Sequence, residues 1–304
     1  MLSSPIDLQQ VRQLFSDPQR SAGTDFLRRE IAGRMREKLE LVKIQPACVL
    51  DAGCGAGADL PELQRSYPEA LVIGLDASPA MLRSGEQARG SARQVLGRFL
   101  SRLTPAALRA EPAPALISGD FADLPLAPRS VDLIWSNLAL HWHPQPHALF
   151  AEWRRVLRTE GLLMFSCFGP DTLTEVRAAF AEADPFPHTL QFVDMHDFGD
   201  MLIENGFSTP VMDMEKLTLT YEHPQALLED VRALGGNPLE NRLRGLTGRS
   251  RYQRLLEALE KLRQPDGRLH LTIEVVYGHA FKPVPAKTES GEAIIRFDLP
   301  RRQR

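Results

Sequence analysis

An apolar strand runs directly into a glycine-rich turn in Val49-Leu50-Asp51-Ala52-Gly53-Cys54-Gly55-Ala56-Gly57. Glycine allows a tight turn and lets a ligand approach the backbone, because it has no Cβ. The carboxylate of Asp51, just before the turn, would repel the pyrophosphate of a dinucleotide. It would attract the ammonium and sulfonium groups of S-adenosylmethionine. The segment therefore favours S-adenosylmethionine as the cofactor.

The same turn also fits the dinucleotide-binding pattern G-x-G-x-x-A, at Gly53, Gly55 and Ala58. That pattern expects an acidic residue about twenty positions later, and Asp76 meets the expectation. Both cofactors contain an adenosine ribose whose hydroxyls a carboxylate can bind, so Asp76 does not discriminate between them. A dinucleotide site and a glycine turn without a ligand stay open as alternatives on this segment alone.

The composition is that of a soluble enzyme, with 304 residues, 43% of them hydrophobic, and a net charge of −3. This length accommodates one large domain or two modest ones. The small net charge gives no general argument for binding nucleic acid or an anionic membrane. No apolar run approaches the roughly 18 residues of a membrane span, and residues 1–5 do not resemble a signal peptide. We expect a cytoplasmic protein without nucleic-acid or membrane partners.

The three cysteines, Cys48, Cys54 and Cys167, lie in or beside expected strands and lack the spacing of metal ligands. Buried cysteines commonly pack as small hydrophobic residues. We therefore expect packing roles rather than a catalytic thiol or a zinc site, and no metal site is predicted.

Apolar segments alternate with amphipathic ones, which is typical of βαβ units and a mostly parallel sheet. Helices are expected between the strands, one beginning at Ser78-Pro79 and another spanning 146–157. Val211–Tyr221 and Leu269–Phe281 alternate like an antiparallel pair of strands at a sheet edge. The preceding strands are expected at Cys48–Asp51, Leu71–Asp76, Ala115–Ser118, Val131–Ser136 and Leu162–Cys167.

These patterns divide the chain into five parts. They are a helical segment (1–45), the core (46–221), a helical cap insertion (222–268), a final sheet strand (269–285) and a tail (286–304). Insertions at such positions commonly form lids over substrates. The insertion also contains a basic cluster, which either docks an acidic partner or forms a solvated surface with internal salt bridges. Its members are Arg242, Arg244, Arg249, Arg251 and Arg254.

Polar side chains follow four of the expected parallel strands, at Asp51, Asp76, Asp120 and Asn137. The carboxyl ends of parallel strands face one crevice, where ligands bind in open α/β sheets. A carboxylate such as Asp120 can accept the exocyclic amine of adenine, and Phe121 beside it can flank the base. We therefore expect these side chains to form one site.

The sequence resembles the class I S-adenosylmethionine-dependent methyltransferases in Leu50–Gly55, Asp76–Leu82, and Gly119-Asp120 with Leu124-Pro125-Leu126. Further segments are similar to the malonyl-acyl-carrier-protein O-methyltransferases of biotin synthesis: Ser130–Ala139, Phe168–Glu175 and Gly245–Gly248. The resemblance spans about residues 26–281 and implies a doubly wound, Rossmann-like α/β sheet, mostly parallel with an antiparallel edge strand. Two segments depart from the family pattern. Residues 87–114 are expected to form an extra arginine-rich helix and its return, and residues 287–304 extend past the last strand.

The resemblance implies a role for each residue around S-adenosylmethionine. From the methionine end to the adenine, these residues are Asp51, Gly53, Gly55 and Gly57, then Asp76, Ala77 and Met81, then Asp120 and Phe121, with Asn137 and Leu138 near the methyl group. Met81 could instead be a core residue of its helix.

The implied substrate is a malonyl thioester on an acyl-carrier protein, and the basic cluster offers a possible docking surface for this carrier at Arg242, Arg244, Arg249 and Arg251. Its carboxylate is ionised near pH 7, so no general base is needed. Catalysis would come from alignment of the reacting atoms and removal of water. Arg177 is the candidate for orienting the substrate, with His141 and Trp142 as walls of the pocket. The alternatives are that Arg177 is an ordinary surface residue and that His141 is structural.

Three alternatives to this function stay open. Leu138–Trp142 and Gly169–Leu173 also resemble mitochondrial complex I assembly factors and their bacterial relatives, which are associated with arginine hydroxylation of a partner protein. A small-molecule methyltransferase would keep the same cofactor pocket. A non-catalytic assembly protein could use the pocket only for stability.

Overall fold

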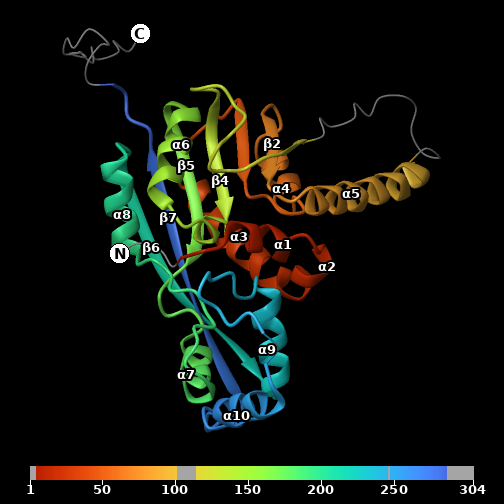
Figure 1. Cartoon of the computed structure of the whole chain (residues 1–304). Coiled ribbons are helices and arrows are strands. Elements are labelled where there is room, and N and C mark those ends of the chain that lie inside the picture. The colour runs from red at the N-terminus through yellow and green to blue at the C-terminus, as the bar shows by residue number, and fades with distance from the viewer. Residues whose placement is uncertain (1–4, 101–113, 246, 286–304) are drawn as a thin grey trace, which may run out of the picture.

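The computed structural model describes residues 5–100, 114–245 and 247–285, and within them seven strands form one sheet in the order β3-β2-β1-β4-β5-β7-β6 (Figure 1). β1 to β5 run parallel to one another, whereas β7 is antiparallel to both β5 and β6. The strands are β1 (Cys48–Ala52), β2 (Leu71–Asp76), β3 (Ala115–Ser118), β4 (Val131–Asn137), β5 (Leu157–Phe168), β6 (Ser208–Tyr221) and β7 (Leu269–Phe281). The predicted α/β sheet is confirmed, with β6 at its edge and the antiparallel strand β7 next to it.

The strand boundaries agree with the sequence pattern to within one residue, except at the start of β6, which lies at Ser208 rather than at the expected Val211, and at the start of β5. This strand begins at Leu157 rather than at the expected Leu162. Its first residue, Leu157, is followed by the polar residues 158–160, and Arg158 forms an ion pair with Asp132 on β4 at 2.8 Å. The pairing with β4 also shifts register between Val131 and Leu133. An apolar pattern marks only the buried part of the strand, so it missed this polar beginning.

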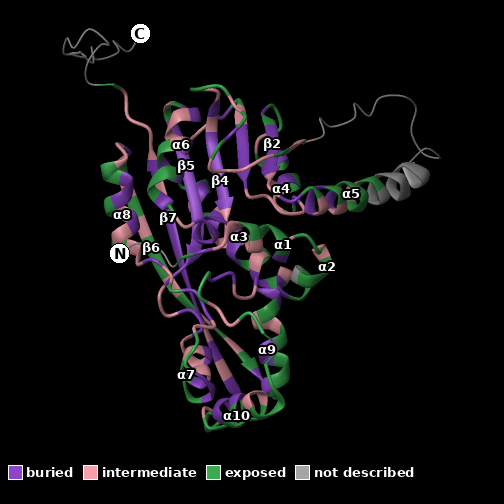
Figure 2. Ribbon diagram, in the orientation of Figure 1, coloured by how far each residue is buried: buried purple, intermediate pink, exposed green. Residues whose placement is uncertain are grey.

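Helices cover both faces of the sheet, because neighbouring residues of each buried strand point to opposite sides. Val49 packs with α3 (Asp25–Glu40) and α4 (Leu60–Ser66), whereas Leu50 packs with α6 (Pro146–Val156) and α8 (Met195–Glu204). The centre of the sheet is accordingly buried on both sides (Figure 2). The other helical elements are α1 (Leu8–Leu14), α2 (Pro18–Ser21), η1 (Ala22–Thr24), α5 (Pro79–Leu100), η2 (Leu140–Trp142), α7 (Thr174–Ala183), α9 (Pro224–Ala233) and α10 (Arg249–Glu260).

The expected extra helix after residue 87 is not a separate element. α5 starts at Pro79 and continues without a break to Leu100. Its first turn is capped as expected, since the hydroxyl of Ser78 accepts a bond from the Met81 N–H at 3.3 Å. The remainder of that insertion, residues 101–113, and the tail 286–304 lie outside the described residues. Within the described residues no helix combines the length and hydrophobicity needed to span a bilayer.

A second lobe forms where β6 and β7 extend beyond the other strands and α7, α9 and α10 pack around them (Figure 1). The N-terminal helices α1 to α3 lie between this lobe and the carboxyl ends of the parallel strands. They are tied to the segment after α9 by a β-bridge between Ile6 and Leu239 and by a bond from the Asp7 N–H to the Pro238 carbonyl. Two segments far apart in sequence therefore cover the same end of the sheet.

Candidate active site

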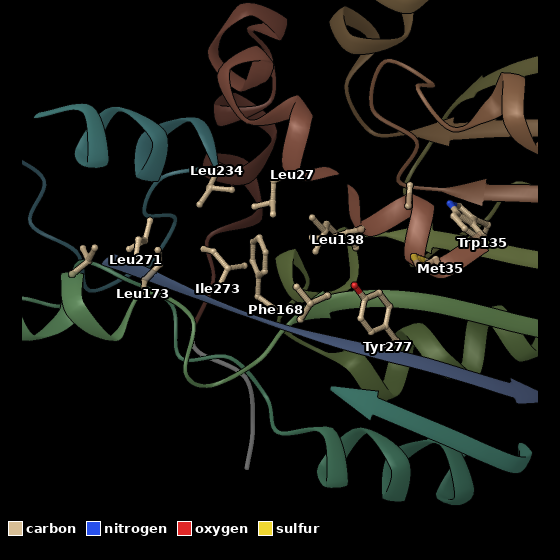
Figure 3. Packing of buried hydrophobic residues seen from close by; sticks show 14 of the residues in the cluster. Leu27, Met35, Trp135, Leu138, Phe168, Leu173, Leu234, Leu271, Ile273 and Tyr277 are labelled. Carbon is tan, nitrogen blue, oxygen red and sulfur yellow. The ribbon is translucent and has the colours of Figure 1, made fainter. Parts of the chain in front are cut away.

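A cavity of about 180 Å³ lies at the carboxyl ends of β1, β2 and β4. It collects most of the residues that the sequence analysis assigned to the cofactor. The expected residues in its lining are Asp51, Gly53, Gly55, Asp76, Ala77, Met81, Phe121, Asn137 and Leu138, together with His141 and Trp142. Figure 3 shows the apolar packing beside it, where Phe168 at the end of β5 and Leu138 just after β4 lie near Leu27 and Leu234.

The glycine turn leaves bare backbone at the cavity wall. Gly53 has a φ of +83°, and a Cβ built on it would lie 2.4 Å from the Cβ of Ala139. Gly55 has a φ of +56°, a conformation that side chains other than glycine rarely adopt. Neither position accepts a side chain without strain or displacement. The turn thus fits a ligand that contacts backbone directly.

Asp76 connects the end of β2 to this turn. Its Oδ2 accepts a bond from the Gly55 N–H and its Oδ1 accepts one from the Ser78 N–H, both at 2.8 Å. Burial raises the pKa of this carboxyl, and the two N–H donors partly oppose the shift. A carboxylate oxygen has more than one acceptor site, so Asp76 can still accept ribose hydroxyls while it holds the turn.

Asp51 is 2% exposed, and its carboxyl lines the cavity. Burial raises its pKa well above the ordinary value, and the nearby Asp59 and Asp76 raise it further. Asp59 is at the start of α4, where it accepts bonds from Trp135 Nε1 at 2.9 Å and Asn137 Nδ2 at 3.1 Å. Three carboxyl groups beside one cavity favour a cationic ligand and disfavour a phosphate. These carboxyl groups therefore fit S-adenosylmethionine.

The end of β4 forms the floor of the cavity with a strained backbone. Leu138 has a φ of +52°, which is uncommon for a residue that is not glycine. Its N–H bonds to the Ser166 carbonyl at 3.1 Å, and Ser166 Oγ donates to Asn137 Oδ1 at 2.9 Å. Such strain, held by neighbouring bonds, is often found where a side chain must be aimed at a ligand.

Comparison with known proteins gives the family. Residues 50–165 match a family model described as a methyltransferase domain. The chain is 46% identical to the malonyl-[acyl-carrier protein] O-methyltransferase of Laribacter hongkongensis, over 89% of both chains. It is also 46% identical to the protein of the same name from Gallionella capsiferriformans, over 96% of both. The chain belongs to the malonyl-[acyl-carrier protein] O-methyltransferase family.

Solved structures agree with the fold. The Bacillus subtilis YcgJ protein superposes with a TM-score of 0.55 at 17% identity, over 84% of this chain and 100% of that one. A Bacillus halodurans protein gives 0.54 at 17% identity, over 83% and 99%. Membership of the malonyl-[acyl-carrier protein] O-methyltransferase family confirms the predicted class of enzyme, a methyltransferase that uses S-adenosylmethionine.

Some lining residues of this methyltransferase were missed by the sequence analysis. Arg12, Phe15 and Arg28 come from the N-terminal helices, and Leu234 comes from the insertion after β6. Nothing in their local sequence marks them, because long-range packing brings them to the cavity. Asp59 did carry a signal, as an acidic residue at the start of the helix that follows the glycine turn.

Two expected cofactor residues are not part of the cavity lining. Asp120 Oδ2 forms an ion pair with Arg12 at 3.0 Å, while its Oδ1 accepts a bond from the Ala122 N–H. Gly57 has a φ of +73°, and a Cβ there would collide with side chains of α4 and α5. Gly57 therefore allows α4 and α5 to pack against the turn and does not itself line the cavity. Contact of Asp120 with adenine stays a proposal.

Arg177 is also away from the cavity lining. From α7 it donates to the carbonyls of Pro170 at 2.6 Å, Thr172 at 2.9 Å and Leu190 at 3.4 Å. Its side chain thus connects the loop after β5 to the segment before α8. Phe168, at the end of β5, is a wall residue, so Arg177 supports that wall from outside.

Replacing Arg177 by Ala is expected to lower the free energy of unfolding by about 2 kcal/mol, since three carbonyls lose their donor. Cofactor affinity should stay the same. Urea unfolding would measure the free energy of unfolding, and calorimetry would measure the cofactor affinity. The matched control is Glu182→Ala on the same helix, which removes only an exposed ion pair with Lys261. An unchanged stability together with a raised substrate KM would instead place Arg177 at the substrate.

The cysteines show no sign of thiolate chemistry. Burial raises the pKa of Cys48, Cys54 and Cys167 above the ordinary value for a thiol, which keeps each protonated. Cys54 is beside the cavity and Cys167 is inside the sheet. In the part of the chain that the structure describes, no group of three or more His, Cys, Asp or Glu side chains could hold a metal.

Proposed function

We propose that this enzyme transfers the methyl group of S-adenosylmethionine to the free carboxylate of a malonyl thioester carried by an acyl-carrier protein. The observation that carries the proposal is the 46% identity, over 89% or more of the chain, to relatives with that name. The acidic cavity beside bare backbone supports the cofactor half of the reaction.

The residues of the cavity can bind and orient, and they do not need to move a proton. When bound, S-adenosylmethionine supplies an electrophilic methyl group: the carboxylate oxygen bonds to the methyl carbon as the carbon–sulfur bond breaks, giving a neutral ester and a thioether. Asp51 would attract the ammonium end, and Asp76 would accept the ribose hydroxyls. Asn137 and Leu138, at the floor of the cavity, would contact S-adenosylmethionine near its methyl group, while aromatic side chains such as Trp142 would exclude water.

Methyl-ester formation tests the reaction directly. With donor labelled in its methyl group, we expect label on malonyl-carrier protein and none on acetyl-carrier protein, which has no free carboxylate. The label should be released by mild base as methanol, as expected of an ester. Binding of the donor without transfer to any acyl carrier would support a non-catalytic protein. An oxidised arginine in a partner would support the assembly-factor alternative.

The expected carrier-docking arginines differ in their surroundings. Arg242 is half-buried and donates to the Leu239 carbonyl and to Gln10 Oε1. The Arg251 guanidinium lies 5.8 Å from the centre of the Phe186 ring. Arg244 and Arg249 are exposed, and within the described residues the side chain of neither makes a hydrogen bond or an ion pair. We infer that Arg244 and Arg249 are the members of the cluster most available to an acidic carrier protein.

Charge reversal at both positions, Arg244→Glu with Arg249→Glu, is expected to raise the KM for malonyl-carrier protein about tenfold or more, because charges at an interface act mainly on encounter. The KM for malonyl-pantetheine, which lacks the carrier, should not change. Arg65→Glu on α4 is the control, since Arg65 is exposed and paired only locally with Glu62. An equal rise for both substrates would contradict docking at this surface.

A further inference from the structure

A buried imidazole in the cavity wall has a hydrogen-bond donor without a partner. His141 is 7% exposed and lines the cavity from η2. Its Nδ1 accepts a bond from the Phe168 N–H at 3.4 Å, which places the proton of the neutral ring on Nε2. Nε2 is buried and has no hydrogen-bond partner among the described residues. An unpaired buried donor costs about 1–3 kcal/mol, so a ligand group that pairs with it would be favoured.

This imidazole stays uncharged at neutral pH. Its ring centre lies 4.8 Å from that of Trp142, 4.6 Å from that of Phe168 and 5.5 Å from that of Phe192. Burial among these rings lowers its pKa to about 3, with a smaller contribution from the positive charge of Arg28. His141 is therefore a donor that carries no charge of its own, and it has no role as a base when Nδ1 is engaged by backbone.

Arg28 brings a positive charge to the same cavity. From α3 its guanidinium donates to Thr24 Oγ1 at 2.9 Å and to Asp25 Oδ1 at 3.3 Å. The side chain is 26% exposed, whereas that of Asp25 is 48% exposed. Arg28 and His141 both line the cavity, and the positive charge of Arg28 contributes to the lowered pKa of His141. They add a cation and a hydrogen-bond donor to a cavity whose lining also includes Asp51, Asp59 and Asp76.

We propose that His141 Nε2–H, with the guanidinium of Arg28 beside it, binds the ionised carboxylate of the acyl substrate and places it next to the methyl donor. This rests on the proposed function and names the residues that would select its substrate. The class selected is a short acyl thioester that ends in a free carboxylate. A thioester ending in a methyl group would leave the donor unpaired.

The balance of charge at these two residues suits the reaction. The carboxylate loses its negative charge as the ester forms, so a group that binds the charged form too tightly stabilises the substrate more than the transition state. A neutral imidazole donor orients one oxygen without that penalty. Arg28 is also ion-paired with Asp25, so it attracts the substrate carboxylate less strongly than an unpaired arginine would. The second carboxylate oxygen stays available for attack.

Substrate binding in variants of His141 tests the proposal without requiring turnover. The probes are malonyl-pantetheine and acetyl-pantetheine, titrated by calorimetry into the full chain saturated with S-adenosylhomocysteine. His141→Phe keeps a ring but removes the donor, and should weaken malonyl-pantetheine binding about tenfold or more. His141→Gln retains an N–H near the position of Nε2 and should stay within about threefold of the wild type. Arg28→Gln should reduce the preference for malonyl over acetyl.

The state of the ring can also be observed directly. In a protein with ¹⁵N-labelled histidine, the Nε2–H resonance of His141 should shift on adding malonyl-pantetheine and not on adding acetyl-pantetheine. Affinity for S-adenosylhomocysteine serves as the folding control for each variant, because Phe168 N–H loses its acceptor in His141→Phe. The small apolar cavity of about 10 Å³ on another side of His141 could hold no more than a water. A resonance that malonyl-pantetheine leaves unchanged would assign the donor to such a water and overturn the proposal.

Substrate binding and ester formation, measured together, distinguish a wrong site from a wrong reaction. If the wild type binds malonyl-pantetheine through His141 but forms no ester, the site stands and the reaction fails. If the wild type forms the ester and both His141 variants bind and react like it, the reaction stands and the site assignment fails. If the wild type prefers acetyl-pantetheine or binds neither thioester, this assignment is wrong.

Discussion

Replacing Asp51 by Asn is expected to weaken S-adenosylmethionine binding about 10- to 100-fold, the range for a hydrogen bond to a charged group. The same variant should be more stable than the wild type when no ligand is bound. The carboxyl is almost fully buried beside Asp59 and Asp76, and its pKa is raised well above the ordinary value. Ionising it in the ligand-free protein costs free energy that an amide of the same shape does not incur.

The pH dependence of stability follows from the sign of this shift. Between the ordinary pKa of an unfolded carboxyl and the raised pKa of Asp51, the folded state binds more protons than the unfolded state. The free energy of unfolding of the ligand-free wild type should therefore fall as pH rises through that window. Burial raises the pKa of Asp59 and Asp76 too, so they act in the same direction. Asp51→Asn should show less of this fall.

Cofactor binding should change with pH in the opposite sense. A cationic ligand favours ionised Asp51, so affinity should rise with pH through the raised pKa and then level off. Thermal unfolding with and without S-adenosylmethionine, repeated over a range of pH, would measure both effects. A ligand-free Asp51→Asn protein that is less stable than the wild type at neutral pH would show that the carboxylate has a structural partner instead.

The matched control makes the same substitution at Asp76, where we expect the opposite effect on stability. Both Asp76 oxygens accept backbone N–H groups, from Gly55 and Ser78. In Asp76→Asn the amide NH₂ must face one of these donors, which should cost about 1–3 kcal/mol. Affinity for the cofactor should fall in both variants. The opposite signs of the two stability changes would distinguish Asp51, a carboxyl that binds a cationic ligand, from Asp76, a carboxylate that stabilises the turn.

The part of the site that could be predicted from sequence is the part fixed by local chain geometry. Two glycines spaced like Gly53 and Gly55 indicate a turn, and Asp51 and Asp76 must lie near it because each is in the last two residues of a parallel strand. The sheet could be predicted for the same reason, since buried strands show a clear apolar pattern. The start of β5 could not, because its polar residues form pairs across to β4.

The remainder depends on the packing of segments that are distant in the chain. Arg28 and Leu234 reach the cavity only because the N-terminal helices and the insertion lie over the sheet end. Arg177 is on the expected helix, but the direction of its side chain was set by three carbonyls that no local pattern reveals. Asp120 is at the expected strand end, and its ion pair with Arg12 joins residues 108 positions apart.

Replacing Gly85 by Ala should lower both the stability of the protein and its affinity for S-adenosylmethionine, although the position is in the interior of a helix. A Cβ at Gly85 would lie 1.9 Å from the carbonyl oxygen of Ala56 and 2.7 Å from its carbonyl carbon. α5 therefore packs directly on the backbone of the glycine turn. Arg89, one turn later, donates to the same Ala56 oxygen at 3.1 Å. The added methyl group must push the helix and the turn apart.

We expect Gly85→Ala to lower the free energy of unfolding by about 3 kcal/mol, near the upper end of the usual cost of overpacking. The gain in helix propensity, at most about 1 kcal/mol, does not offset this. Gly90→Ala in the same helix is the control, because its Cβ would meet nothing within 4 Å. It should be neutral or stabilise the protein by up to about 1 kcal/mol.

Urea unfolding compares the two variants, and calorimetry with S-adenosylmethionine compares their binding. If Gly85→Ala folds but binds poorly, the turn has moved away from the ligand while the sheet has stayed intact. If both alanine variants are equally stable and bind equally well, helix α5 does not press on the turn. The positioning of Gly55 would then rest on its bond to Asp76 alone.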